Sequence, residues 1–175
     1  NKINFVFNIK EGNKFYVERI NILGNNITNE AFIRQQIVVD EGDPFNSILH
    51  NKTINNLKSS RLFRSVVSDI KDGSAKGLKI INLTVEDQPT GEISAGAGYG
   101  SNGSSFSIGI KENNFNGNGI KLDANLALTE NSIRGKFSYT NPYFSYSDRA
   151  VTASLESTST DKEKDYGFKS SLNRI

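Results

Sequence analysis

The feature that most restricts how this chain can fold is an alternation of apolar and polar residues that begins at Gly91. Five consecutive segments of about nine or ten residues alternate in this way, with turns rich in Gly, Asn and Ser between them, and a sixth begins at Tyr166. Successive side chains of a strand point to opposite faces, so each segment predicts a strand with one apolar face. The apolar positions are Ile93, Ala95, Ala97 and Tyr99; Phe106, Ile108 and Ile110; Ile120, Leu122, Ala124, Leu126 and Leu128; Ile133, Phe137 and Tyr139; and Val151, Ala153 and Leu155.

The length of these segments indicates a membrane. About nine to eleven residues allow a tilted strand to cross a bilayer, and barrel strands alternate between lipid and a polar interior. A soluble β-sandwich also alternates, so the pattern alone leaves that class open. No run reaches the ~18 to 20 apolar residues of a membrane-spanning helix.

The first half of the chain has a mixed pattern. Residues 15–24 have strand composition, with Tyr16, Glu18, Ile20 and Ile22 expected on one face. Helices are expected over residues 30–38, capped by Thr28 or Asn29, and over residues 46–60; the buried stripe of the second helix is expected to be Ile48, Leu49, Ile54 and Leu57. Strands over residues 63–70 and 77–86 follow. The order β-α-α-β-β predicts one α+β module with a small sheet under two helices.

Residues 1–12 carry a short strand pattern that ends in a polar turn, typical of the last strand of a preceding module. The expected division is therefore residues 1–12 as that strand, 13–88 as the α+β module and 89–175 as the alternating strands. Because the chain begins in mid-pattern and contains no Met, we expect it to be a piece of a longer protein.

The segment "GYGSNG", residues 98–103, has the letters of a dinucleotide-binding loop. That loop requires a helix after its third glycine, since the helix N-terminus holds the pyrophosphate. Here Gly103 leads into an alternating segment, and Asp123, at the distance of the ribose-binding acid, lies in another. We therefore interpret the motif as a hairpin turn.

Other chemistry has little support in the sequence. The chain has no Cys, and its single histidine, His50, has no second histidine to complete a metal site. Glu41 and Asp43 sit beside Pro44 and are interpreted as loop residues rather than an acid/base pair. A net charge of +2 without a basic stripe argues against nucleic acid. We expect no enzyme, no cofactor and no metal.

The first alternating segment, Gly91–Gly100, is rich in glycine. Glycine weakens a strand and removes side chains that would hold it in a sheet, so this strand could bend or detach. Small residues that fill a tight barrel corner are the alternative, and the sequence leaves both open.

The fourth alternating segment ends in "TNPYFSY", where Tyr143, Phe144 and Tyr146 follow a proline. Clustered aromatics at a strand end are typical of the membrane interface. A soluble turn with a buried aromatic corner is the alternative.

Several longer stretches carry a family resemblance. "KFYVERINILGNNITNEAFIRQQIVVDEGDPF", "LKSSRLFRSVV" and "LTVEDQPTGEISAGAGYG" resemble the last POTRA domain of the BamA family running into its barrel, and "ENNFNGNGIKLDANL" and "TNPYF" resemble the barrel segments that follow. The resemblance covers essentially the whole chain. It implies a POTRA module (β-α-α-β-β) followed by the N-terminal part of an antiparallel transmembrane β-barrel.

The resemblance also implies a function: insertion of β-barrel proteins into the bacterial outer membrane without nucleotide or cofactor, with the POTRA part in the periplasm. An incoming strand would pair with the backbone of the first barrel strand, and extended peptides with a POTRA edge strand. Implied partners are nascent outer-membrane barrel proteins, outer-membrane lipid, and periplasmic lipoproteins, the last at Glu41. The barrel-strand residues are Glu92, Ile93, Ser94, Ala95, Gly96, Ala97, Gly98 and Tyr99; the POTRA edge residues are Ser65, Val66, Val67, Ser68 and Asp69. The alternative within the superfamily is a two-partner secretion or translocation-assembly transporter.

Overall fold

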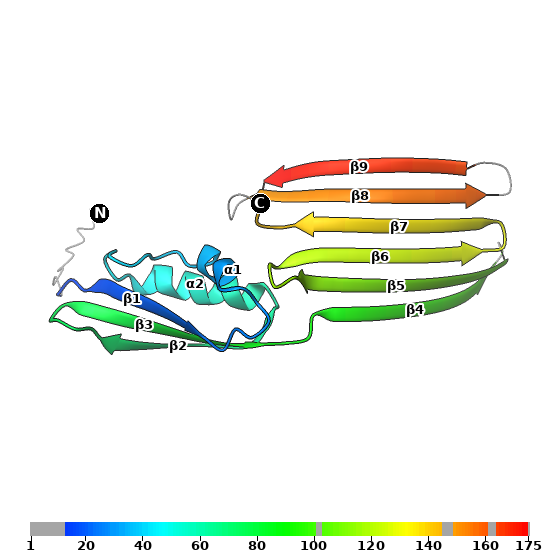
Figure 1. Cartoon of the computed structure of the whole chain (residues 1–175). Coiled ribbons are helices and arrows are strands. Elements are labelled where there is room, and N and C mark those ends of the chain that lie inside the picture. Colours follow the sequence, from blue (N-terminus) through cyan, green and yellow to red (C-terminus); the bar gives the residue numbers. More distant parts are fainter. Residues whose placement is uncertain (1–12, 101–102, 145–148, 161–163, 175) are drawn as a thin grey trace, which may run out of the picture.

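The computed structural model describes residues 13–100, 103–144, 149–160 and 164–174. The chain forms an α+β module followed by a single antiparallel sheet (Figure 1). Its elements are β1 (Tyr16–Leu23), α1 (Glu30–Gln35), α2 (Ser47–Ser59), β2 (Phe63–Asp72), β3 (Leu78–Asp87), β4 (Gly91–Gly100), β5 (Gly103–Phe115), β6 (Ile120–Thr129), β7 (Ser132–Asn141), β8 (Arg149–Thr160) and β9 (Lys164–Arg174). The expected preceding strand, residues 1–12, lies outside the described residues, and the proposed domain boundaries stay a prediction.

The α+β module, β1 to β3, has the predicted order β-α-α-β-β. Its sheet has the order β1-β3-β2, with β1 parallel and β2 antiparallel to the central β3. Both helices lie on one face of this sheet (Figure 1), and apolar side chains from sheet and helices form one core. Within the described residues, neither helix is long and apolar enough to cross a membrane. The core members are Val17, Ile20, Phe32, Ile33, Val39, Leu57, Leu62, Phe63, Val66, Ile81, Leu83 and Val85.

Helix α2 buries only part of the face that was predicted: Leu57 is in the core and Ile54 packs partly buried against it. The buried residues are His50, Thr53 and Leu57, whereas Ile48 is 77% exposed and Leu49 37% exposed. Positions 50, 53 and 57 recur at helical spacing and define the face toward the core. The prediction was wrong for Ile48 and Leu49 because it grouped residues by apolarity, while the buried Thr53 hydroxyl accepts a hydrogen bond from the Val38 N–H at 3.0 Å.

Two further local predictions need correction. Helix α1 ends at Gln35 rather than at residue 38, because the β-branched residues that follow it favour helix poorly and Val39 enters the core. In β1 a register shift between Val17 and Arg19 breaks the alternation. Val17 and Ile20 are therefore both buried, although they were expected on opposite faces.

The six-stranded sheet confirms the predicted alternating strands. Its order is β4-β5-β6-β7-β8-β9, and every neighbouring pair is antiparallel. The register aligns the apolar positions across all the strands in one row, which consists of Ile93, Ile110, Ala124, Phe137, Leu155 and Phe168. The hairpin interpretation of residues 98–103 is also confirmed, since Gly100 pairs with Gly103 across β4 and β5.

Candidate strand-pairing site

The first strand of the large sheet, β4, is an edge strand. Within the described residues it pairs only with β5, and all ten of its residues are exposed. In an antiparallel pair the N–H and C=O groups of alternate residues point away from the partner. The outer side of β4 therefore presents backbone donors and acceptors along the predicted pairing residues 92–99.

Side-chain packing between β4 and β5 is weak on the polar face. Three successive cross-strand pairs there, Ser94 with Gly109, Gly96 with Ser107 and Gly98 with Ser105, each contain a glycine, whereas Glu92 pairs with Lys111 at the start of the strand. A Cβ atom at Gly96 or Gly98 would lie 3.0 Å from the Oγ atom of its partner serine. Because cross-strand side-chain contacts stabilise a sheet, residues 94–98 are held to β5 on this face mainly by backbone hydrogen bonds and by two serine hydroxyls, Ser94 and Ser105, that donate to carbonyls across the strand pair.

The opposite face of the sheet is a broad exposed apolar surface. Its strands are 10 to 13 residues long, which at about 3.3 Å per residue and the tilt of barrel strands suits the hydrocarbon thickness of a bilayer. A continuous patch of this size is unusual on a soluble monomer and is typical of a face covered by lipid or protein. The large exposed side chains on it are Ile93, Tyr99, Phe106, Ile108, Ile110, Leu126, Leu128, Ile133, Phe137, Leu155 and Phe168.

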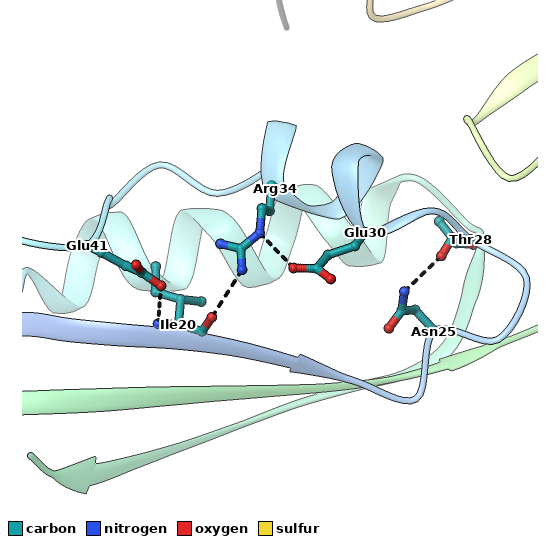
Figure 2. Close-up of polar contacts among 6 residues, drawn as sticks. All are labelled: Ile20, Asn25, Thr28, Glu30, Arg34 and Glu41. Carbon is teal, nitrogen blue, oxygen red and sulfur yellow. Dashed lines mark hydrogen bonds and ion pairs between the residues drawn. The ribbon is translucent and has the colours of Figure 1, made fainter.

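The two outer strands of the α+β module differ in how their edges are covered. On β1, the Val17 N–H donates to the Asp43 carbonyl at 2.9 Å, and the Val17 carbonyl accepts from the Gly42 N–H at 2.7 Å. Farther along, the Ile20 N–H donates to Glu41 Oε1 at 2.9 Å (Figure 2). Residues 41–43 thus satisfy outward backbone groups of Val17 and Ile20 and mask this part of the β1 edge.

Strand β2 forms the other edge of the module, as the resemblance implied. Residues 65–69 face no further strand within the described part of the chain. Val66 points into the core, whereas Val67 is 57% exposed. Extended polypeptides add to open edges of this kind through main-chain hydrogen bonds; docking at Ser65–Asp69 stays a prediction.

Glu41 makes a hydrogen bond within the α+β module. Its carboxylate is exposed, and one oxygen accepts the Ile20 N–H described above. Arg34, paired with Glu30 at 2.8 Å, also approaches the Ile20 carbonyl at 3.5 Å (Figure 2). The role of Glu41 in binding a lipoprotein stays a prediction, and any test of it must separate the charge from this hydrogen bond.

The predicted interface aromatics lie in different surroundings. The Tyr143 ring packs edge-on against Phe32 of α1, with ring centroids 5.3 Å apart, and burial raises the pKa of its hydroxyl above the ordinary value. Phe144 is 49% exposed, and Tyr146 lies outside the described residues. The interface role stays a prediction for Phe144 and Tyr146, whereas Tyr143 contacts protein.

His50 is buried beside Phe45, with ring centroids 5.9 Å apart. Burial lowers the pKa of its imidazole, which is therefore neutral at pH 7. In the described part of the chain no three His, Asp or Glu side chains come together as metal ligands would.

The comparisons with known proteins agree with this architecture. Residues 15–87 match the POTRA family, described as "Surface antigen variable number repeat". The chain is 29% identical to the outer membrane protein assembly factor BamA of Buchnera aphidicola, covering 95% of this chain and 29% of the relative. It is 26% identical to BamA of Neisseria meningitidis, covering 81% of this chain and 18% of the relative. It therefore spans less than a third of these curated relatives.

Among solved structures, BamA from Haemophilus ducreyi lacking POTRA domains 1–3 superposes with a TM-score of 0.80 at 24% identity, over 90% of this chain and 32% of that one. CdiB from Acinetobacter baumannii gives a TM-score of 0.58 at 17% identity, over 83% of this chain and 28% of that one. Both likenesses concern the fold.

The POTRA-plus-barrel class of proteins is defined by a POTRA module whose last strand continues into an antiparallel sheet with one exposed apolar face. Within that class the chain resembles the BamA assembly factors, over the part that holds the last POTRA domain and the first barrel strands. BamA proteins are outer-membrane proteins, so the six-stranded sheet lies in the bacterial outer membrane and the POTRA module in the periplasm.

Proposed function

We propose that this chain is the strand-templating part of a factor that inserts β-barrel proteins into the bacterial outer membrane. It acts without nucleotide, cofactor or covalent chemistry. The observation that carries the proposal is the exposed outer edge of β4, whose polar-face pairs with β5 contain a glycine at each of the positions 94, 96 and 98. A nascent strand that enters lipid needs partners for its backbone groups, and the outer edge of β4 offers them.

The POTRA module supplies a second pairing edge in the periplasm. Masking of β1 leaves β2 as the open edge of the module, and in the view of Figure 1 β2 and β4 lie along the same lower border of the molecule. Strand β3 passes directly into β4 through residues 88–90. A substrate held at β2 is therefore delivered close to β4. Glu41 contacts a periplasmic lipoprotein of the assembly complex, and the apolar face of the sheet contacts lipid.

Disulfide trapping tests the templating step. We expect Ser94→Cys, on β4, to cross-link in full-length parent protein to a cysteine in the terminal strand of a stalled substrate barrel. Ser138→Cys, on the same polar face but in the interior strand β7, is the matched control and is expected not to cross-link. This part of the chain has no native cysteine to interfere. Equal trapping at both positions, or none at Ser94, would refute pairing at β4.

The alternative is a transporter of the two-partner secretion or translocation-assembly type. The fold-level likeness to CdiB is compatible with it, whereas the sequence relatives favour an assembly factor. Depletion of the parent protein separates the two. A broad loss of unrelated outer-membrane barrels supports general insertion, and loss of one secreted protein with porins intact supports a dedicated transporter.

A further inference from the structure

The last two residues of β5 and the turn into β6, together residues 114–119 and called the turn 114–119 below, contact the POTRA module at a loop more than 80 residues away in sequence. Asn114 is 6% exposed, and its Nδ2 donates to Thr28 Oγ1 at 2.9 Å while its Oδ1 accepts the Gly119 N–H at 2.9 Å. The buried Asn114 amide therefore bonds both to a residue of its own turn and to the POTRA module. Thr28 Oγ1 donates in turn to Asp87 Oδ1 at 2.6 Å, which extends the chain of hydrogen bonds to the end of β3.

Asn29 makes three further hydrogen bonds to the same turn. Its N–H donates to the Gly117 carbonyl at 2.9 Å, and its Nδ2 donates to the Asn116 carbonyl at 2.9 Å and to Asn118 Oδ1 at 2.8 Å. Asn29 is also the N-cap residue of α1, where an asparagine side chain ordinarily accepts from a helix N–H; here it makes no such bond. Its side chain therefore bonds to the turn rather than to the N-terminus of the helix.

Two glycines let the turn approach this closely. Gly117 and Gly119 have φ values of +71° and +64°, in the left-handed region that favours glycine. A Cβ at Gly117 would lie 2.4 Å from the Ile27 carbonyl oxygen, and one at Gly119 would lie 2.3 Å from Phe32 Cε2. A second contact, between Phe32 and Tyr143 of the β7–β8 turn, lies on the same side of α1.

We propose that the turn 114–119 is a docking element that fixes the POTRA module on the sheet, with Asn114 as its positioning residue. The three-residue connection 88–90 alone leaves rotation between the two parts, whereas a buried, hydrogen-bonded network with no room for a side chain selects one orientation. The docked turn thereby holds the open edges of β2 and β4 in a fixed relative position. This last consequence rests on the proposed function; the docking itself does not.

Double electron–electron resonance on the full-length protein in nanodiscs tests the docking. Spin labels at Lys58→Cys on α2 and Arg134→Cys on β7, both exposed positions, report the distance between module and sheet. Asn114→Asp keeps an acceptor for the Gly119 N–H but has no donor for Thr28 and stands near Asp87, so the turn forms and the docking is lost. We expect its distance distribution to broaden at least twofold or to gain a second peak.

Gly117→Ala is a second, independent variant with the same expected broadening. Gly77→Ala is its matched control, because Gly77 also has a positive φ, +89°, but the nearest atom to its Cβ is 3.8 Å away. Asn131→Ala, in the turn at the opposite end of the sheet, controls for loss of a turn asparagine. Native-like narrow distributions in both Asn114→Asp and Gly117→Ala would overturn the proposal. Because the readout is a distance, failure here is distinguishable from failure of barrel insertion.

Discussion

If weak packing allows β4 to separate from β5, then restoring side chains on its polar face must hold the strand in place. The perturbation places alanine at Gly96 and Gly98. A Cβ at either position lies 3.0 Å from the partner Oγ, so each change is paired with replacement of that serine: Gly96→Ala with Ser107→Ala, and Gly98→Ala with Ser105→Ala. The reference protein is the double variant Ser105→Ala/Ser107→Ala, which carries the serine changes alone.

The magnitude follows from the backbone. A glycine inside a strand is less favourable than alanine by roughly 0.5–1 kcal/mol, so two replacements add about 1–2 kcal/mol to the free energy of detaching β4. At about 1.4 kcal/mol per factor of ten, the detached population falls roughly 5- to 30-fold.

Hydrogen–deuterium exchange of the β4 amides in the full-length protein in nanodiscs measures this population. We expect exchange over residues 92–99 to slow by the same 5- to 30-fold relative to the serine double variant, while exchange in β7 is unchanged. Substrate assembly in a reconstituted reaction should slow in parallel. Equal or faster exchange refutes the energetic argument, and slower exchange with unaltered assembly refutes strand release as a step of the reaction.

Three further predictions concern the POTRA module. Glu41→Gln keeps an oxygen for the Ile20 N–H and Glu41→Ala does not, so only the alanine variant should lose about 1 kcal/mol of local stability. Because the charge is proposed to bind the lipoprotein, both variants should fail to co-purify with it. Normal capture of the lipoprotein by Glu41→Gln would contradict that role. A photocross-linker at Val67 on β2 should capture unfolded substrate, whereas one at Arg19 on the masked β1 should not; equal capture would remove the distinction between the edges. Burial lowers the pKa of His50 in the folded state, so the unfolded state binds more protons as pH falls below about 6.5 and the folded state loses stability. Hydrogen-exchange protection factors of α2 should therefore fall from pH 7.5 to 5.5 in the native protein but not in His50→Gln. A pH-independent native protein would contradict the last prediction.

The sheet could be predicted almost completely from the sequence because strand alternation is a local signal with a period of two residues. The same signal failed in β1, where the register shift after Val17 inserts one residue and carries Ile20 to the buried face. The spacing of apolar residues in α2 misplaced part of the buried face, because a buried threonine hydroxyl that pairs with Val38 takes the place expected for Ile48.

The docking turn could not be predicted for a different reason. Asn114, Gly117 and Gly119 lie in a segment whose composition already suffices for a hairpin turn. Their partners Thr28, Asn29 and Phe32 lie in another domain, and no period or spacing links the two segments. Tyr143 was likewise assigned to the membrane interface because its neighbours are aromatic, and only the packing reveals Phe32 as its partner.

The contrast between masked and open edges argues that the open ones are functional. An unpaired strand edge promotes aggregation, and proteins ordinarily cover it. This chain covers β1 with a positive-φ glycine, Gly42, and with the Glu41 carboxylate, yet within the described residues it leaves β2, the other edge of the same module, open. The means of masking an edge is therefore present in the same module. An edge left open at β2, in a module that masks its other edge, is what a protein that pairs with other strands requires.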